Sequence, residues 1–196
     1  HVGVSDVDLA AAEVTCAQIE GLGGSGEALR LDVTQFDQWQ ALIQQLRTRW
    51  PRLDQLINNA GICAAGQIGQ LPLDDFQAVL QVNFQGVLHG CQAVVGWLQE
   101  SAPGGHVVNV ASIFGLVAAP SMGAYNVSKA AVVALSETLY GELHPLGIGV
   151  TVVAPGFFRS QLIARGRFAE PSQRQLAQHY LDHATISAEQ VVQQTL

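Results

Sequence analysis

The sequence of 196 residues is poor in charge, since Lys, Arg, Asp and Glu make up 13% of it and the formal net charge is -7. It contains no run of Lys and Arg, which argues against a nucleic-acid surface or an anionic membrane as the main partner. No apolar stretch approaches the ~20 residues of a membrane-spanning helix, and no charged, apolar, small-residue leader opens the chain. We therefore predict a cytoplasmic protein that binds neither nucleic acid nor membranes.

Cysteine is also scarce. Cys16, Cys63 and Cys91 are odd in number, widely spaced and set in apolar or helical stretches, so they are predicted to be reduced, buried thiols, and no metal site is expected. Hydrophobic residues, by contrast, make up 48% of the chain. That proportion is enough for one good core, which predicts a single domain over residues 1–196.

Short β-rich runs alternate with helical stretches along the chain, which is the pattern of a parallel sheet built from βαβ units. The predicted strands cover residues 1–5, 28–31, 53–57, 106–110 and 150–153. The predicted helices cover residues 9–20, 36–49, 74–99 and 124–143, with shorter ones after Phe158 and after Ala188. Ser187 with Glu189 and Gln190 indicates a helix start. The fold class is therefore α/β, a three-layer, doubly wound, Rossmann-like parallel sheet flanked by helices.

The first and last parts of such a fold are missing from the pattern. The chain opens inside a strand, with no earlier βα unit, and stops inside a helix. Gly21, Gly23 and Gly26 spell GxGxxG, but they follow a predicted helix and lead into a strand, which reverses the order of a phosphate-binding turn. We interpret them as a helix stop. We expect the first βα unit and the last strand of the sheet to be absent.

Tyr125 and Lys129 lie four residues apart in the predicted helix 124–143, so both side chains project from one face, about 6 Å apart along the axis. An exposed tyrosine beside a solvated lysine also has this spacing. Two features favour chemistry instead. Lys129 is the only lysine of the chain, and Ser112 lies just past a strand end, where open α/β sheets bind their ligands.

The pair has a chemical rationale. An unperturbed tyrosine, with a pKa near 10, is a poor base at neutral pH. A nearby ammonium favours the phenolate, and lowering the pKa by ~3 units corresponds to ~4 kcal/mol, which requires a close cation in a desolvated site. We therefore predict that Lys129, together with the positive ring of a bound cofactor, lowers the pKa of Tyr125 and that Ser112 hydrogen-bonds the reacting oxygen.

Several further motifs follow one another along the chain, although each has an ordinary structural explanation as a turn, a loop or a mid-helix asparagine. In chain order they are Asn58-Asn59-Ala60-Gly61 after a strand, Asn83 inside a long helix, Ser112, Tyr125-xxx-Lys129, and Pro155-Gly156 after a later strand. With them the sequence resembles the short-chain dehydrogenases/reductases over essentially its whole length. The glycine-rich TGxxxGxG turn of that family is not present.

The resemblance implies an oxidoreductase that transfers a hydride between a nicotinamide cofactor and a secondary alcohol or ketone. The implied catalytic residues are Ser112, Tyr125, Lys129 and Asn83, the last holding a water in a proton relay. The implied cofactor-binding residues are Asp6, Asp32, Val33, Asn58, Ala60, Gly61, Tyr125, Lys129, Pro155, Gly156 and Ser160. Ser160 stands where the family usually has threonine. Without the glycine-rich turn, we expect these 196 residues alone to bind the cofactor poorly.

Cofactor choice is predicted from Asp6, which follows the opening strand at the place where the family's acidic residue bonds the adenosine ribose hydroxyls. Its carboxylate would repel the 2'-phosphate of NADP, and the sequence places no arginine or lysine near it. NAD is therefore expected rather than NADP. Asp8 fits a helix N-cap better than a ribose ligand.

Substrate choice is expected to lie in residues 157–187, where the resemblance implies a variable substrate lid. Apolar rings there can line a pocket for a small-molecule alcohol or ketone, namely Phe157, Phe158, Phe168 and Tyr180. Arg165 and Arg167 can meet an anionic group or simply face solvent.

Two other functions remain open from the sequence. One is an epimerase or dehydratase of the same superfamily that keeps NAD tightly bound, and the other is a non-catalytic, NAD-binding regulatory protein. The resemblance also implies a homo-dimer or homo-tetramer formed through the helices that hold Asn83 and Tyr125, and the apolar run 130–135 is compatible with such an interface.

Overall fold

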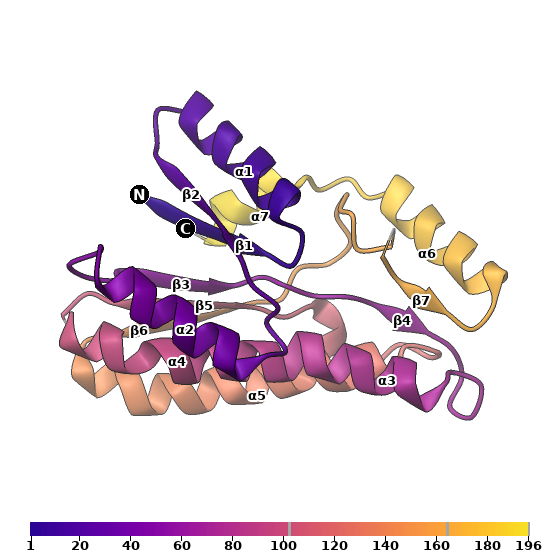
Figure 1. The fold of residues 1–196 in the computed structure, drawn as a ribbon. Coiled ribbons are helices and arrows are strands. Elements are labelled where there is room, and N and C mark those ends of the chain that lie inside the picture. Colours follow the sequence, from indigo (N-terminus) through magenta and orange to yellow (C-terminus); the bar gives the residue numbers. More distant parts are fainter. Residues whose placement is uncertain (102, 164, 196) are drawn as a thin grey trace.

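The computed structural model describes residues 1–101, 103–163 and 165–195. Figure 1 shows three strands lying over a layer of long helices, with the amino-terminal pair of strands and its helix set apart from them. The prediction of an α/β fold with parallel strands flanked by helices is confirmed.

All described strands pair in parallel, and they form three groups. The groups have the orders β1-β2, β3-β5-β6 and β4-β7. The strand bounds are β1 (Val2–Asp6), β2 (Gly26–Arg30), β3 (Gln55–Asn58), β4 (Ala64–Ala65), β5 (His106–Val110), β6 (Gly149–Val153) and β7 (Arg167–Phe168). The five longer strands match the predicted ones to within two residues at each end. The pair β4-β7 was not predicted, because two-residue strands carry no periodicity.

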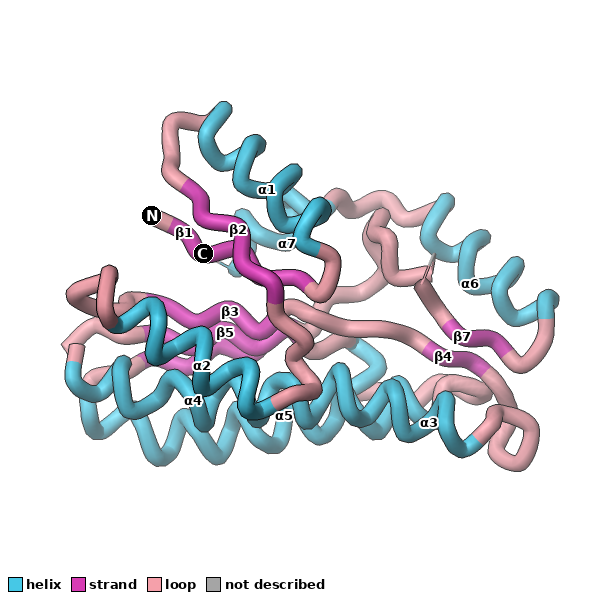
Figure 2. Tube along the Cα trace, in the orientation of Figure 1, coloured by secondary structure: helices cyan, strands magenta, loops and turns pink. Residues whose placement is uncertain are grey.

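Figure 2 shows how the helices cover these strands. The helices are α1 (Leu9–Gly21), α2 (Phe36–Arg47), α3 (Leu73–Leu80), α4 (Gly86–Glu100), α5 (Gly123–Leu143), α6 (Pro171–Asp182) and α7 (Ala188–Thr195). The helix expected soon after Phe158 begins only at Pro171, where a proline at the first position and a capping box between Glu170 and Gln173 define its start. The predicted start at Ser187 is confirmed, because its hydroxyl accepts from the Gln190 amide.

The sheet is divided between β1 and β3. In the doubly wound order one strand position lies between these two, and the described residues do not fill it. Ile57 of β3 is 53% exposed as a result, which is unusual for an apolar residue of a parallel strand. That a first βα unit and a last strand complete this sheet stays a prediction.

The glycine-rich stretch after α1 ends the helix, as predicted. Gly23 has φ +85°, a left-handed conformation that glycine adopts without strain. The Gly24 amide donates back to the Ile19 carbonyl at 3.0 Å, in the manner of a helix C-cap. The chain then enters β2 at Gly26, so this GxGxxG forms no phosphate-binding turn.

The long helix predicted over residues 74–99 is helical throughout, but one of its turns is not α-helical. A π-helical turn, Gln81–Gln85, separates α3 from α4. Single π turns in α-helices occur frequently at functional sites. Here the turn contains Asn83, whose side chain is buried.

The main core lies between β5 and the helices α4 and α5. Its buried members include Val94, Leu98, Val107, Val132 and Ile148. Within the described part of the chain, no helix combines the length and the hydropathy needed to cross a bilayer.

Candidate active site

Helix α5 brings two of the predicted catalytic residues together. Its buried positions recur every three or four residues, and both Tyr125 and Lys129 fall on that buried face. Ser112 follows the carboxyl end of β5 and caps a short 3-10 helix, Ile113–Gly115. The Ser112 hydroxyl is near enough to the Tyr125 phenol to lower its pKa, so the strand end and the helix meet at these two hydroxyls.

The Tyr125 phenol is protonated at neutral pH in this structure. Burial raises its pKa to about 12, and the nearby Ser112 hydroxyl opposes that rise only in part. The expectation that Lys129 lowers the pKa of Tyr125 is therefore not met in the chain by itself. The Lys129 ammonium lies over the tyrosine ring, 5.7 Å from the ring centroid.

Lys129 is 4% exposed, and burial lowers the pKa of its amine to about 8. Its Nζ donates one hydrogen bond at 2.8 Å, to the carbonyl of Val110. No other hydrogen-bond partner of this ammonium occurs among residues 1–101, 103–163 and 165–195. Two of its three N–H groups are thus left for a polar ligand in a desolvated place.

Asn83 reaches the same place from the π-helical turn. Its Oδ1 accepts from the Ile62 amide at 2.8 Å, and its Nδ2 donates to the Ile62 carbonyl at 2.9 Å and to Ser128 Oγ at 3.1 Å. Both amide protons are therefore used inside the protein. A water in a proton relay would therefore bind the main-chain carbonyl of Asn83 or the second lone pair of its Oδ1. The side chain fixes the loop that follows β3.

Asn58 faces inward rather than toward a ligand. Its Nδ2 donates to Asn109 Oδ1 at 2.9 Å, and Asn109 Nδ2 donates to Ser136 Oγ at 3.0 Å. Any contact of Asn58 with a cofactor would use its backbone. The sequence analysis missed Asn109, although a polar residue inside the apolar strand His106–Val110 was a usable signal.

Asp6 lies at the carboxyl end of β1, and its surroundings correct the sequence analysis. Its Oδ1 accepts from the Asp8 amide at 2.9 Å, while Asp8 caps α1 as predicted. Arg165 Nη1 lies 3.8 Å from the same oxygen, and Arg165 Nη2 lies 3.7 Å from Asp8 Oδ2. The expectation of no nearby arginine was wrong, because the loop before β7 folds back over β1.

The remaining predicted cofactor residues lie in ordered turns. The Asp32 carboxylate accepts from the Thr34 amide at 3.0 Å, and the Val33 carbonyl accepts from the Trp39 indole at 3.2 Å. The Pro155 carbonyl accepts from the Ile113 amide at 2.9 Å, which holds the loop after β6 beside the one after β5. Of the other four, Ala60 and Ser160 are exposed, Gly156 borders open space, and Gly61 is partly buried beside Asn83 and Lys129.

The segment 157–187 covers the predicted catalytic residues. It is attached to the loop after β3 through the pair β4-β7 and an ion pair of Arg167 with Asp75 at 2.6 Å. Ile163 and Leu181 pack with Tyr125 and Cys63 in one apolar cluster. Arg167 is therefore held in a close ion pair, whereas Arg165 lies near two carboxylates without a hydrogen bond to either.

A series of aromatic contacts leads from Tyr125 into this segment. The rings of Phe114 and Tyr125 meet edge-on with centroids 6.4 Å apart, and those of Phe114 and Phe157 do so at 5.6 Å. Phe157 stacks on Tyr180 at 5.0 Å. Phe114, Phe157 and Tyr180 thus form an apolar wall beside Tyr125.

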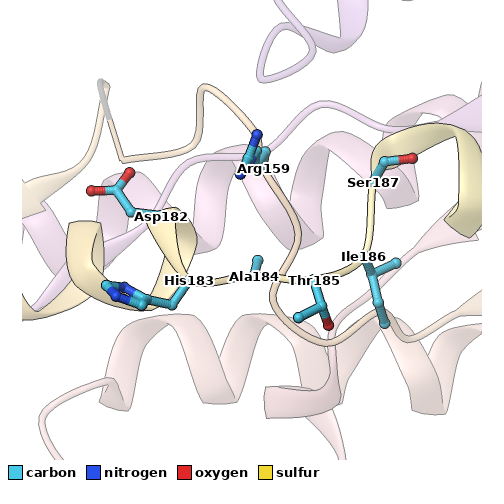
Figure 3. Close-up of a pocket in the computed structure, with 7 residues that line it drawn as sticks. All are labelled: Arg159, Asp182, His183, Ala184, Thr185, Ile186 and Ser187. Atoms are coloured by element: carbon cyan, nitrogen blue, oxygen red, sulfur yellow. The ribbon is translucent and has the colours of Figure 1, made fainter.

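A pocket of about 500 Å³ lies on another side of the segment. Figure 3 shows Arg159 facing the stretch 182–187, which connects α6 with α7. None of the predicted site residues lines it. The reactive groups of the predicted catalytic residues Ser112, Tyr125 and Lys129 are buried away from this pocket.

The order of these elements and residues is matched by a known family. The family model described as short chain dehydrogenase matches residues 1–170.

The chain belongs to the short-chain dehydrogenases.

Two curated relatives of this family differ in how much of them the chain covers. The probable oxidoreductase EphD of Mycobacterium tuberculosis is 36% identical over 171 residues, which cover 87% of this chain and 29% of EphD. The cyclopentanol dehydrogenase of a Comamonas species is 32% identical over 175 residues, which cover 89% of this chain and 70% of that enzyme. The chain thus spans less than a third of the length of EphD.

Two solved dehydrogenase structures are also similar, the first of them a short-chain dehydrogenase/reductase. One is from Burkholderia phymatum in complex with NAD, with a TM-score of 0.90 and 29% identity, and the match covers 97% of this chain and 73% of that one. The other is a gluconate 5-dehydrogenase from Burkholderia cenocepacia in complex with NADP and tartrate, with a TM-score of 0.76 and 27% identity, covering 82% and 62%. Nicotinamide cofactors of both kinds therefore occur among its structural relatives.

Proposed function

We propose that the natural protein containing this chain transfers a hydride between NAD(H) and a secondary alcohol or ketone, with Tyr125 as the acid and base. The observation that carries this proposal is the meeting of Ser112 and Tyr125 beside a buried, incompletely bonded Lys129 ammonium. Membership of the short-chain dehydrogenases supports the oxidoreductase class.

The residues fit a nicotinamide cofactor at one point in particular. Lys129 has two N–H groups without a protein partner among the described residues, and ribose hydroxyls are suitable acceptors for them. Beside it, a Cβ on Gly61 would lie 3.6 Å from Nζ and 3.4 Å from Asn83 Oδ1, so this glycine leaves space next to the ammonium. Pro155, Gly156 and Ser160 would flank the nicotinamide.

In the direction of reduction, the substrate carbonyl oxygen accepts hydrogen bonds from Ser112 and Tyr125. A nicotinamide cofactor held by Lys129 and the loop after β6 would supply the hydride that the carbonyl carbon receives. Tyr125 gives its phenolic proton to the oxygen, which completes the alcohol, and the Lys129 ammonium stabilises the phenolate that remains. The resting phenol of Tyr125 holds the proton that this direction requires.

Asp6 supports NAD as the preferred cofactor in this proposal. A carboxylate accepts a hydrogen bond from a ribose 2'-hydroxyl and repels a 2'-phosphate. The natural protein should therefore bind NAD more tightly than NADP, and the reverse order of affinities would contradict this part.

The segment 157–187 is proposed as the substrate lid, because it covers Tyr125 with apolar side chains. Pairing of two or four copies through α4 and α5 is proposed as well. Three free, buried cysteines support a reducing, cytoplasmic location.

The test uses the natural protein, NAD and a panel of secondary alcohols that includes cyclopentanol, with formation of NADH as the signal. The change Tyr125→Phe should lower turnover on the order of 10²–10⁴-fold, because it removes the proton donor and leaves the ring. Tyr140→Phe is the matched control, since Tyr140 lies on the same helix with half of its side chain exposed.

Three results would oppose the proposal. Turnover by Tyr125→Phe at the unaltered rate would show that Tyr125 is not the acid and base. Tight retention of NAD without exchange during turnover would support an epimerase or dehydratase. Binding of NAD without turnover of any substrate, unchanged by Tyr125→Phe, would favour a regulatory protein.

A further inference from the structure

The short strand β7 attaches the segment 157–187 to the loop after β3. It pairs with β4 over two residues only, and Figure 1 shows the two strands side by side. The Arg167 amide donates to the Cys63 carbonyl at 2.9 Å, and the Ala169 amide donates to the Ala65 carbonyl at 2.9 Å. Such a short pairing holds weakly by itself, since even a complete two-stranded hairpin is marginal in water.

The side chain of Arg167 adds a charged contact to this attachment. Its Nη1 donates to Asp75 Oδ1 at 2.6 Å and so links β7 to the first turn of α3. The Asp75 side chain is 26% exposed, which shields the pair in part from water and strengthens the attraction. The ion pair and the backbone bonds therefore act on the same two-residue strand.

Gly166 brings β7 into close contact with the loop after β3. A Cβ at this position would lie 2.6 Å from Cys63 Sγ and 2.7 Å from the Phe168 ring, which is closer than side chains pack in folded proteins. The Cys63 thiol also donates to the Leu162 carbonyl at 3.4 Å. The contact is thus tight on both sides of the masking loop, and any larger residue at position 166 would push β7 away.

The position of β7 determines how Tyr125 is covered. Phe168, which follows Arg167 in the chain, packs against an apolar cluster formed by Cys63, Tyr125, Ile163 and Leu181. Tyr125 is only 6% exposed beneath it. A substrate has to enter below this cover, and the cover excludes water from the phenol when it closes.

We propose that Arg167 is a positioning residue, whose ion pair with Asp75 holds β7 on β4 so that the apolar cover closes over a substrate bound at Tyr125. Arg167 acts through β7 and not on the reacting atoms. The inference rests on the proposed oxidation of a secondary alcohol at Tyr125, and it assigns the ion pair to substrate affinity rather than to the chemical step.

The kinetic experiment uses the natural protein, saturating NAD and the alcohol of the panel that it oxidises fastest. Arg167→Gln should raise the KM for this alcohol about three- to fivefold, the factor that a partly exposed ion pair contributes to an equilibrium, and should change kcat less than about twofold. Arg167→Lys keeps the charge and should recover part of the loss. Arg52→Gln breaks the ion pair with Asp54, at 2.7 Å and far along the chain, and as the matched control should leave KM unchanged.

Two readouts separate positioning from a general loss of structure. The Kd of NADH, followed by its fluorescence, should be the same for Arg167→Gln and the unaltered protein. Asp75→Asn should raise KM by the same factor as Arg167→Gln, and the double variant should raise it no further, because either change alone already breaks the pair.

Hydrogen exchange tests the attachment without any substrate. In Asp75→Asn the amides of Arg167 and Ala169 should exchange about threefold faster or more, while those of β5 keep their rates. Unchanged KM values in both single variants, effects that multiply in the double variant, or unchanged exchange at these two amides would overturn the inference. Absence of turnover by the unaltered protein with every alcohol of the panel would instead overturn the proposed function.

Discussion

The side chain of Asn58 donates a hydrogen bond to Asn109 across two neighbouring strands, with Nδ2 and Oδ1 2.9 Å apart. The two residues are also paired in register between β3 and β5. Asn109 in turn donates a hydrogen bond through Nδ2 to Ser136 Oγ of α5. A buried polar chain therefore ties both strand ends that lead into the site to the helix that carries Tyr125.

Removal of Asn109 should be costly for stability. Asn109→Ala strips a partner from both Asn58 and Ser136 in the interior, and we expect a loss of about 3 kcal/mol in the free energy of unfolding, since each buried polar group left unpaired costs about 1–3 kcal/mol. Denaturant unfolding measures it. Asn59→Ala, at an exposed position next to Asn58, is the control and should change stability by less than about 0.5 kcal/mol. Equal effects of the two changes would refute a structural role for the hydrogen bonds that join Asn58, Asn109 and Ser136.

Asn83 should matter to the loop after β3 more than to any other part of the protein. Asn83→Ala leaves the Ile62 amide and carbonyl without their partners, and we expect about 2–4 kcal/mol of destabilisation. Hydrogen exchange at the Ile62 amide gives a local readout, because it should rise more than exchange in the core of β5. If exchange rises uniformly, the side chain does not fix this loop.

The sequence was sufficient for the elements and for the trio because these signals are local. Tyr125 and Lys129 share a helix face by spacing alone, and Ser112 follows an evident strand. The polar chain through Asn109 needed the register between β3 and β5, which no local pattern specifies. The same holds for Arg165, whose partners Asp6 and Asp8 lie far away in sequence and meet it only once the loop before β7 has folded back.

Lys129 gives a pH dependence with a definite sign. Its amine has a pKa of about 8 in the fold against a usual value of 10.5, so the unfolded chain binds more protons between these values. Stability contributed through this group therefore rises from pH 8 to about 10.5, and below pH 8 the buried charge costs roughly 3 kcal/mol. In the absence of cofactor, Lys129→Met should be more stable than the unaltered protein at pH 7.

The measurement compares unfolding of the two proteins at several pH values. Their difference should shrink as the pH rises past 8, because the unaltered protein then loses its buried charge. Cys63 and Cys91, whose thiol pKa values burial raises to about 11, titrate in both proteins and cancel in the comparison. A difference that stays constant across this range would show that the amine of Lys129 is not destabilised by burial.

The stacked pair Phe157 and Tyr180 is expected to select the substrate. Tyr180→Ala removes half of the stack beside the site and should raise KM for ring-bearing ketones several-fold, with a smaller effect on short open-chain ketones. Tyr180→Phe keeps the ring and should restore the KM. Steady-state kinetics with both ketone classes checks this, and equal changes for both classes would exclude a selective role.

The raised pKa of Tyr125 is a second property that the sequence did not predict. The lysine at the fourth position predicted a lowered pKa, but burial of the phenol has the larger effect. Spacing places two residues on one face, whereas the balance between burial and charge depends on side-chain positions that only the folded structure provides.

The π-helical turn Gln81–Gln85 has a consequence for the history and engineering of this helix. Each residue of an α-helix advances the chain by about 100° around the axis, so one surplus residue turns the two flanking segments against each other by about that angle. Deleting Gln85, which is exposed, should let α3 and α4 join as a plain helix and swing Asn83 away from Ile62. The hydrogen bonds of Asn83 with the loop after β3 thus depend on one extra residue in the helix. In an alignment with a relative that lacks this residue, the difference would appear as a one-residue gap.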